Sequence, residues 1–169
     1  MKSSMLAAVL GLGVAVSAVP AWSQSSALSD PITAAQPTLK KQALTIIGAN
    51  GVRHAFTVEI AATPREQEIG LMFRTSIPAD TGMLFVWPQP QEQQMWMKNC
   101  PVPEDMVFIG PDNRILHIAE NTVPYSMANV DSGGIAKATL ELQGGLTAKL
   151  GIGVGDLVTN DTLGAPNKS

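Results

Sequence analysis

The chain of 169 residues has a formal net charge of −3, from eleven Lys and Arg against fourteen Asp and Glu, and 45% of its residues are hydrophobic. This length suits one domain, and the absence of a basic cluster excludes nucleic acid as a leading partner class. One cysteine and two histidines exclude an intramolecular disulfide and the common four-ligand zinc sites built from Cys and His. No cofactor is predicted.

The N-terminal residues have the pattern of an export segment. Residues 1–23 combine Lys2, a short apolar stretch and small residues flanking Trp22, which is typical of a cleaved signal peptide. The apolar stretch is shorter than the roughly 20 residues that span a bilayer. We therefore expect a periplasmic or secreted protein without a stable membrane span after cleavage. Loss of Lys2 would change the net charge to 10 − 14 = −4.

Composition also divides the rest of the chain. Residues 24–39 are rich in Ser, Pro, Thr, Ala and Gln and lack an apolar period, which predicts a flexible linker. Residues 162–169 resemble a loose tail. The remaining residues, 40–161, are predicted to form a single globular domain with one modest core.

The first predicted elements are two strands and a helix. Residues 52–60 alternate between apolar and polar side chains, and the Asn50-Gly51 turn predicts a hairpin with the strand at residues 44–47. Thr63, Pro64 and Glu66 then have the spacing of a capping box, which predicts a short helix that ends at about Met72.

In the rest of the chain apolar and polar side chains again alternate with a period of two residues. Strands are expected at residues 82–87, 95–99, 106–109, 114–119, 135–142 and 157–159, with a tight turn at 110–113 and a helical turn at 145–150. The fold class is therefore α+β, with a mainly antiparallel β-sheet that can curl into a barrel and one or two short helices.

Several motifs together resemble the family catalogued as domain of unknown function 192. They are Thr63-Pro64-Arg65-Glu66 with Gly70-Leu71-Met72-Phe73-Arg74, Gly82-Met83-Leu84-Phe85, Trp96-Met97-Lys98-Asn99, Pro103-x-Asp105, Leu140-Glu141-Leu142 and Gly151-Ile152-x-x-Gly155-Asp156. The resemblance covers about residues 52–159 and implies a compact, β-rich prokaryotic domain that is often exported, with no established reaction. Cys100 and Glu104 depart from the family pattern, which typically has Thr and Leu there.

The same motifs contain the candidate ligand-binding residues. An Arg side chain suits bidentate carboxylate contacts and a Trp ring suits stacking, so this group favours a small anionic or sugar-like ligand of the cell envelope. The competing interpretation is a structural ion-pair network among Arg65, Lys98 and Asp105. The candidate site comprises Arg65, Arg74, Trp96, Lys98, Asn99 and Asp105.

A binding or accessory module is favoured over an enzyme, but two other functions stay open. An envelope polysaccharide or peptide hydrolase would pair Asp105 with Glu104, Glu120 or Glu141, although Glu141 is expected to be solvated or salt-bridged. A soft Cu(I) site would use Met95 and Met97 with Cys100 or a histidine.

A Cys/His hydrolase is disfavoured. Its base would have to be His54 or His117, and lone histidines on apolar faces more often belong to the core. Cys100 is instead expected to be a buried or half-buried, inert thiol.

Overall fold

The computed structural model describes residues 30–165. The predicted signal peptide at 1–23 and the last four residues of the predicted tail lie outside this range. The described elements are β1 (Lys41–Ile47), β2 (Arg53–Ala61), α1 (Pro64–Ile69), β3 (Thr81–Met95), β4 (Glu104–Ile109), β5 (Ile115–Ala119), β6 (Val130–Gln143), α2 (Leu146–Leu150), β7 (Leu157–Thr159) and a 3₁₀ helix at Asp161–Leu163. No helix within residues 30–165 is long and apolar enough to cross a bilayer.

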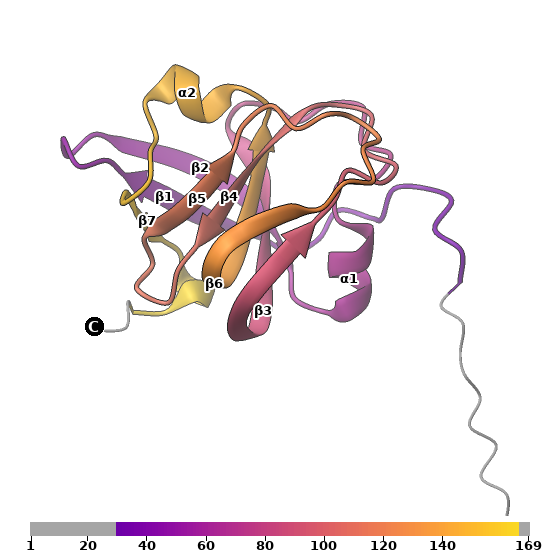
Figure 1. Cartoon of the computed structure of the whole chain (residues 1–169), viewed down its shortest axis with the longest axis horizontal. Coiled ribbons are helices and arrows are strands. Elements are labelled where there is room, and N and C mark those ends of the chain that lie inside the picture. The colour runs from indigo at the N-terminus through magenta and orange to yellow at the C-terminus, as the bar shows by residue number, and fades with distance from the viewer. Residues whose placement is uncertain (1–29, 166–169) are drawn as a thin grey trace, which may run out of the picture. The chain divides into compact units, whose positions relative to one another are not determined.

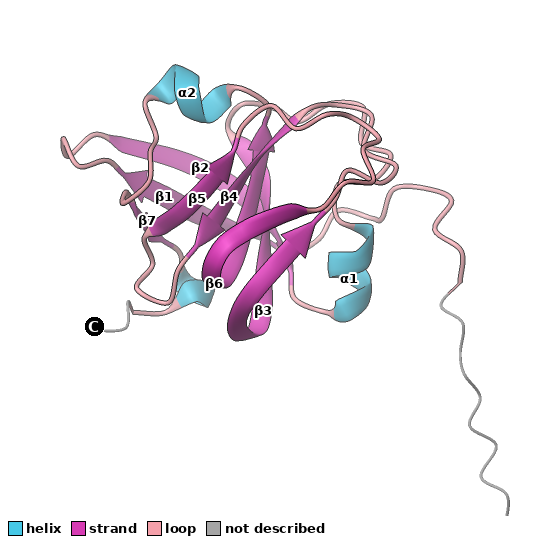
Figure 2. Cartoon of the chain, in the orientation of Figure 1, coloured by secondary structure: helices cyan, strands magenta, loops and turns pink. Residues whose placement is uncertain are grey.

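The seven strands form one curled sheet in the order β5-β4-β6-β3-β2-β1-β7 (Figure 1). All neighbouring strands are antiparallel except the β2–β3 pair. The curl brings the two edges of the sheet together, because Ile115 N donates to Asp156 O at 2.9 Å and Val158 N donates to Asn113 O at 2.8 Å. The predicted α+β class, with a mainly antiparallel sheet curled towards a barrel, is confirmed (Figure 2).

Local sequence accounts for the first turn and the first helix. Gly51 has a φ of 80°, which allows the chain to reverse between β1 and β2. Both halves of the predicted capping box are present: Glu66 N donates to the Thr63 hydroxyl, and Thr63 N donates to the Glu66 carboxylate at 2.9 Å. The helix is nevertheless shorter than predicted, because Gly70 ends it with a φ of 50°.

Hydrophobic residues bury both faces of the central strands. One cluster, which includes Leu44, Val58, Leu84 and Leu140, fills the interior of the curled sheet. A second cluster, which includes Met83, Phe85, Met106 and Phe108, lies on the outer face of β3 and β4, where Leu71, Met72, Met97 and Cys100 also belong to it. The outer face of the sheet is therefore a second core rather than a solvated surface.

The predicted strand at residues 95–99 is wrong. Strand β3 runs from Thr81 to Met95 with irregular pairing to β6 between Val86 and Gln94, and the chain then leaves the sheet. Cys100 N donates to Met97 O at 3.1 Å, and Asn99 takes a φ of 56°. This turn buries Met97 and Cys100 and leaves Trp96 exposed, so the strand-like alternation of side chains does not hold.

Residues at both ends of the predicted domain also pack on it. Gln36, within the segment predicted as a linker, is buried, and Ile32 and Leu39 contact the second cluster. Leu163, within the predicted tail, is buried in the first cluster. Residues on both sides of 40–161 therefore pack on the domain.

Candidate functional site

A pocket of about 210 Å³ lies on the outer face of the sheet, between α1 with the residues after it and the segment that follows β3. Its walls are mostly apolar and aromatic, and one of its residues, Glu141, is a buried acid near the C-terminal end of β6. The lining residues are Gln67, Glu68, Ile69, Gly70, Leu71, Met72, Phe85, Trp87, Gln94, Met95, Trp96, Lys98, Cys100 and Glu141.

The sheet register explains why Glu141 faces the second core. Strand β6 lies between β3 and β4, and Glu141 pairs with Met83 on one side and Met106 on the other. Directly opposite residues of antiparallel strands share a face. Glu141 therefore projects among methionines and is only 4% exposed, so the expectation that it is solvated or salt-bridged is wrong.

Glu104 lies on the same face of the sheet as Glu141. It pairs with Gln143, two residues from Glu141 along β6, and is completely buried. Both carboxyl oxygens of Glu104 and Oε2 of Glu141 have no hydrogen-bond partner. In the described part of the chain, neither acid forms an ion pair. Buried polar atoms are almost always paired in folded proteins, so three unpaired carboxyl oxygens in one place are unusual.

Burial controls the protonation of this carboxyl pair. It raises the pKa of Glu104 to about 7, although the adjacent Cys100 thiol opposes the shift. Burial, reinforced by the charge of Glu104, holds the pKa of Glu141 well above its usual range. Near neutral pH the pair therefore retains at least one proton, because two buried carboxylates side by side repel each other.

Cys100 lines the pocket beside the carboxyl pair. Its thiol donates to the Lys98 carbonyl oxygen at 3.5 Å. Burial and the charges of Glu104 and Glu141 raise the pKa of the thiol far above its usual range. The prediction of a buried thiol is therefore confirmed, and its environment disfavours the thiolate that nucleophilic attack requires.

Backbone contacts hold the walls of the pocket in place. Phe73 and Tyr125 have φ values of 62° and 60°, which are uncommon for bulky side chains. Phe73 N donates to Asn99 O at 2.8 Å, and Tyr125 N donates to Cys100 O at 3.1 Å. The Asn99 amide also donates to the Met72 sulfur at 3.7 Å. The strained residues Phe73 and Tyr125 thus connect the segment 97–100 to the residues after α1 and to the loop before β6. Strained backbone of this kind is common around binding sites.

Of the six candidate residues, Trp96 and Lys98 line the pocket, and Asn99 links its two walls. The Lys98 Nζ atom lies 5.1 Å from the centre of the Trp96 ring, a cation–π contact. Trp96 is 41% exposed, and we therefore place this pair at the mouth of the pocket.

Asp105 lies on the opposite face of the sheet, because it follows Glu104 directly in β4. Its carboxylate accepts four hydrogen bonds, from Asn121 N, Gly145 N, Thr147 N and the Thr147 hydroxyl, at 2.7–2.9 Å. These bonds fix the start of α2. Asp105 therefore does not face Glu104, Glu120 or Glu141 across a groove, and the carboxyl pair is Glu104 with Glu141 instead.

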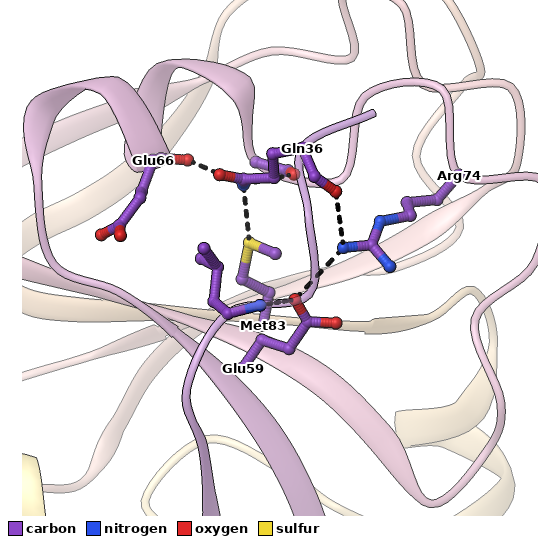
Figure 3. Close-up of polar contacts among 7 residues, drawn as sticks. Gln36, Glu59, Glu66, Arg74 and Met83 are labelled. Atoms are coloured by element: carbon purple, nitrogen blue, oxygen red, sulfur yellow. Dashed lines mark hydrogen bonds and ion pairs between the residues drawn. The ribbon is translucent and has the colours of Figure 1, made fainter. Parts of the chain in front are cut away.

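The two candidate arginines lie away from the carboxyl pair. Arg65 forms an exposed ion pair with Glu68 on α1. Arg74 Nη2 contacts Glu59 Oε2 at 3.1 Å and Gln36 O at 3.4 Å, and the Gln36 amide in turn reaches Glu66 O and the Met83 sulfur (Figure 3). This network attaches the segment before β1 to α1. The structure therefore does not bring Arg65, Lys98 and Asp105 together as one ion-pair network.

The sequence reasoning missed the carboxyl pair as the centre of the site. The available indication was an acid between two leucines, in Leu140-Glu141-Leu142, but alternation alone places that acid on a polar face. Within residues 30–165, no group of three His, Cys, Asp or Glu side chains is arranged to hold a metal ion. Three sulfur side chains, those of Met72, Met95 and Cys100, do line the pocket.

Comparison with known proteins identifies the family. No curated protein matches the chain. A solved structure from Sinorhizobium meliloti 1021, described as a candidate transcription regulator, is 39% identical, covers 75% of this chain and 98% of its own, and has a TM-score of 0.72. A protein of unknown function from Novosphingobium aromaticivorans DSM 12444 is 41% identical, covers 75% of this chain and 91% of its own, and has a TM-score of 0.70. Residues 45–160 match the DUF192 family model, described as an uncharacterized ACR, and the chain belongs to this family.

Proposed function

We propose that the domain is a binding or accessory module for a small cell-envelope ligand that occupies the pocket. The observation that carries this proposal is the buried Glu141 side chain, which lines the pocket and whose Oε2 atom has no hydrogen-bond partner. A buried polar group without a hydrogen bond costs about 1–3 kcal/mol, so a ligand that supplies the missing bond is favoured by a similar amount.

The walls suit a sugar-like ligand. Trp87 and Trp96 offer flat apolar surfaces against which a sugar ring can pack, while hydroxyl groups can bond to the Glu141 carboxyl. Lys98 at the mouth suits an anionic substituent at the outer end of the same ligand. We further propose that residues 1–23 direct the chain to the periplasm or the medium, where such ligands occur.

A ligand panel tests the binding proposal. Monosaccharides, peptidoglycan fragments and small carboxylic acids are titrated against the full-length protein by calorimetry and by quenching of tryptophan fluorescence. Trp96→Ala is expected to weaken binding about tenfold or more, which corresponds to roughly 1.4 kcal/mol. Val154→Ala, at an exposed apolar side chain that does not line the pocket, serves as the control. Binding that survives Trp96→Ala and Glu141→Gln unchanged would contradict the proposal.

Export is tested separately. Cell fractionation should recover the protein outside the cytoplasm, and the mass of the recovered chain should reveal a cleavage near residue 23. A full-length cytoplasmic chain would contradict this part of the proposal and leave the pocket proposal intact.

A hydrolase remains the second candidate, favoured by the two neighbouring carboxyl groups whose raised pKa values suit proton donation at neutral pH. It predicts turnover of envelope polysaccharide or peptide that is lost in Glu141→Gln. The absence of turnover by the parent protein on both substrate classes would remove this candidate.

Soft-metal binding is the third candidate, favoured by Met72, Met95 and Cys100, which all line the pocket. Met97 does not line the pocket and instead accepts a hydrogen bond from the Thr122 hydroxyl at 3.1 Å. A stoichiometric Cu(I) complex that is sensitive to Met95→Leu but not to Met97→Leu would support this candidate.

The description of the Sinorhizobium relative as a regulator does not alter the proposal. Eleven Lys and Arg against fourteen Asp and Glu provide no basic surface of the kind that holds a nucleic-acid backbone.

A further inference from the structure

We propose that the pocket recognises its ligand through a primary ammonium group, which the Glu141 carboxyl receives with Glu104 behind it. This inference rests on the proposed binding function and specifies the class of ligand. The shared chemistry is one ammonium group on a small neutral or anionic body, which an amino sugar and an amino acid both provide.

The first argument is the unmet hydrogen bonding of the carboxyl pair. Oε2 of Glu141 is buried without a hydrogen-bond partner, and the buried carboxyl of Glu104 has only the weakly donating Cys100 thiol beside it. An ammonium group carries three N–H donors, so a single nitrogen at Glu141 can bond to that carboxylate and direct further donors towards its neighbour. A lone hydroxyl provides one donor only.

The second argument is charge. No Lys, Arg or His within the described residues forms an ion pair with either acid, and the Cys100 thiol that interacts with both is neutral because its pKa is raised. A ligand cation is therefore the missing partner that would allow one acid to ionise inside the core. The proton that this acid holds in the empty pocket passes to solvent when the ammonium group binds, so binding and proton release are linked.

The third argument concerns the mouth of the pocket. Lys98 is held over the Trp96 ring, so a positive charge already lies at the entrance. A diamine would place its second charge near that cation. The outer end of the ligand is therefore neutral or anionic, and a ligand with a single ammonium group is favoured over a polyamine.

The experiment compares matched pairs of small molecules on the full-length parent protein. D-glucosamine is compared with D-glucose, and D-alanine with D-lactate, so that each pair differs at the ammonium group. Calorimetry at about pH 6.5 in two buffers of different ionisation enthalpy measures the number of protons released. The two pairs also distinguish an amino sugar from an amino acid as the source of the shared chemistry.

The expected result is that at least one amine binds about tenfold or more tightly than its partner, with release of up to one proton. Glu141→Gln should abolish most of that preference, and Glu104→Gln should reduce the proton release, whereas Glu120→Gln at an exposed site should change neither. The parent-protein measurement decides the question even if one variant fails to fold.

Two results would overturn the inference. One is equal binding of the two members of each pair, and the other is amine binding without any proton release. If neither amine binds while other members of the broader ligand panel do, the ammonium inference fails and the proposed binding function stands. If no compound of either set binds in the pocket, both fail.

Discussion

Replacement of Glu104 by Gln should change how the stability of the domain depends on pH. The side chain keeps its shape but loses its proton equilibrium. In the folded protein burial raises the pKa of Glu104 to about 7, whereas its unperturbed value is 4.5. A carboxyl whose pKa is raised by folding binds more protons in the folded than in the unfolded chain between these two values. Its stabilising contribution is therefore complete below about pH 4.5 and is lost as the pH rises through about 7.

The magnitude follows from the same two values. The difference between 4.5 and about 7 corresponds to roughly 3 kcal/mol in the free energy of unfolding. About 2 kcal/mol of this should be lost between about pH 5 and pH 7.5 in the wild-type protein. Glu141, whose pKa is also raised, should add to the loss. The variant lacks the contribution of Glu104, so its stability relative to wild type should increase by about 2 kcal/mol over this interval.

Urea denaturation at a series of pH values measures the effect. The free energy of unfolding is obtained for wild type, Glu104→Gln and the exposed control Glu120→Gln at each pH, and the difference from wild type is plotted. Taking the difference removes the pH dependence of carboxylates that do not interact with Glu104. The contribution of Glu141 changes in Glu104→Gln, because the charge of Glu104 helps to raise the pKa of Glu141. A constant difference between wild type and Glu104→Gln from about pH 5 to pH 7.5 would refute the assignment of Glu104 as a buried acid with a raised pKa.

Three further predictions concern the packing of Gly82, the hydrogen bonds of Asp105 and the burial of Cys100. Gly82→Ala should destabilise the domain by about 2–3 kcal/mol, because the added Cβ would lie 2.5 Å from the Glu141 carbonyl oxygen. The control Gly153→Ala has open space around the added Cβ and should have little effect in the same urea denaturation assay. Asp105→Asn should cost about 2–4 kcal/mol, because the amide cannot accept all four hydrogen bonds that hold the start of α2; an equal loss in exposed Asp80→Asn would count against this explanation. Cys100 should react with iodoacetamide at least about tenfold more slowly in the folded protein than in urea at the same pH, since burial raises its pKa and covers its sulfur. Mass spectrometry follows the modification, and equal rates would show that the thiol is open to solvent.

The carboxyl pair shows why the site was harder to predict than the fold. Sequence reasoning placed an acidic partner opposite Asp105, yet the two neighbours Glu104 and Asp105 point to opposite faces of β4. The Asp105 carboxylate accepts hydrogen bonds from backbone N–H groups at the start of α2. Glu104 of β4 and Glu141 of the neighbouring strand β6 lie on the other face of the sheet. Which of two adjacent acids is structural depends on what covers each face, and alternation in one strand does not contain that information.

Local interactions determined much of this protein from its sequence alone. The turn at Gly51, the capping box of α1, the turn before β5 and the helical turn ended by Gly151 each depend on a few neighbouring residues, and all are found where the sequence predicts them. The family resemblance and the mainly antiparallel α+β class follow from the same local patterns and are confirmed.

Only the tertiary structure decided what the outer face of the sheet does. The chain after β3 turns at Asn99 and, together with the residues after α1, covers that face with a second core. This cover removes water from Glu104 and Glu141, raises the pKa values of both, and leaves a pocket above Glu141. Burial depends on segments far apart in the sequence, so a residue that alternation assigns to solvent becomes the buried floor of the candidate site.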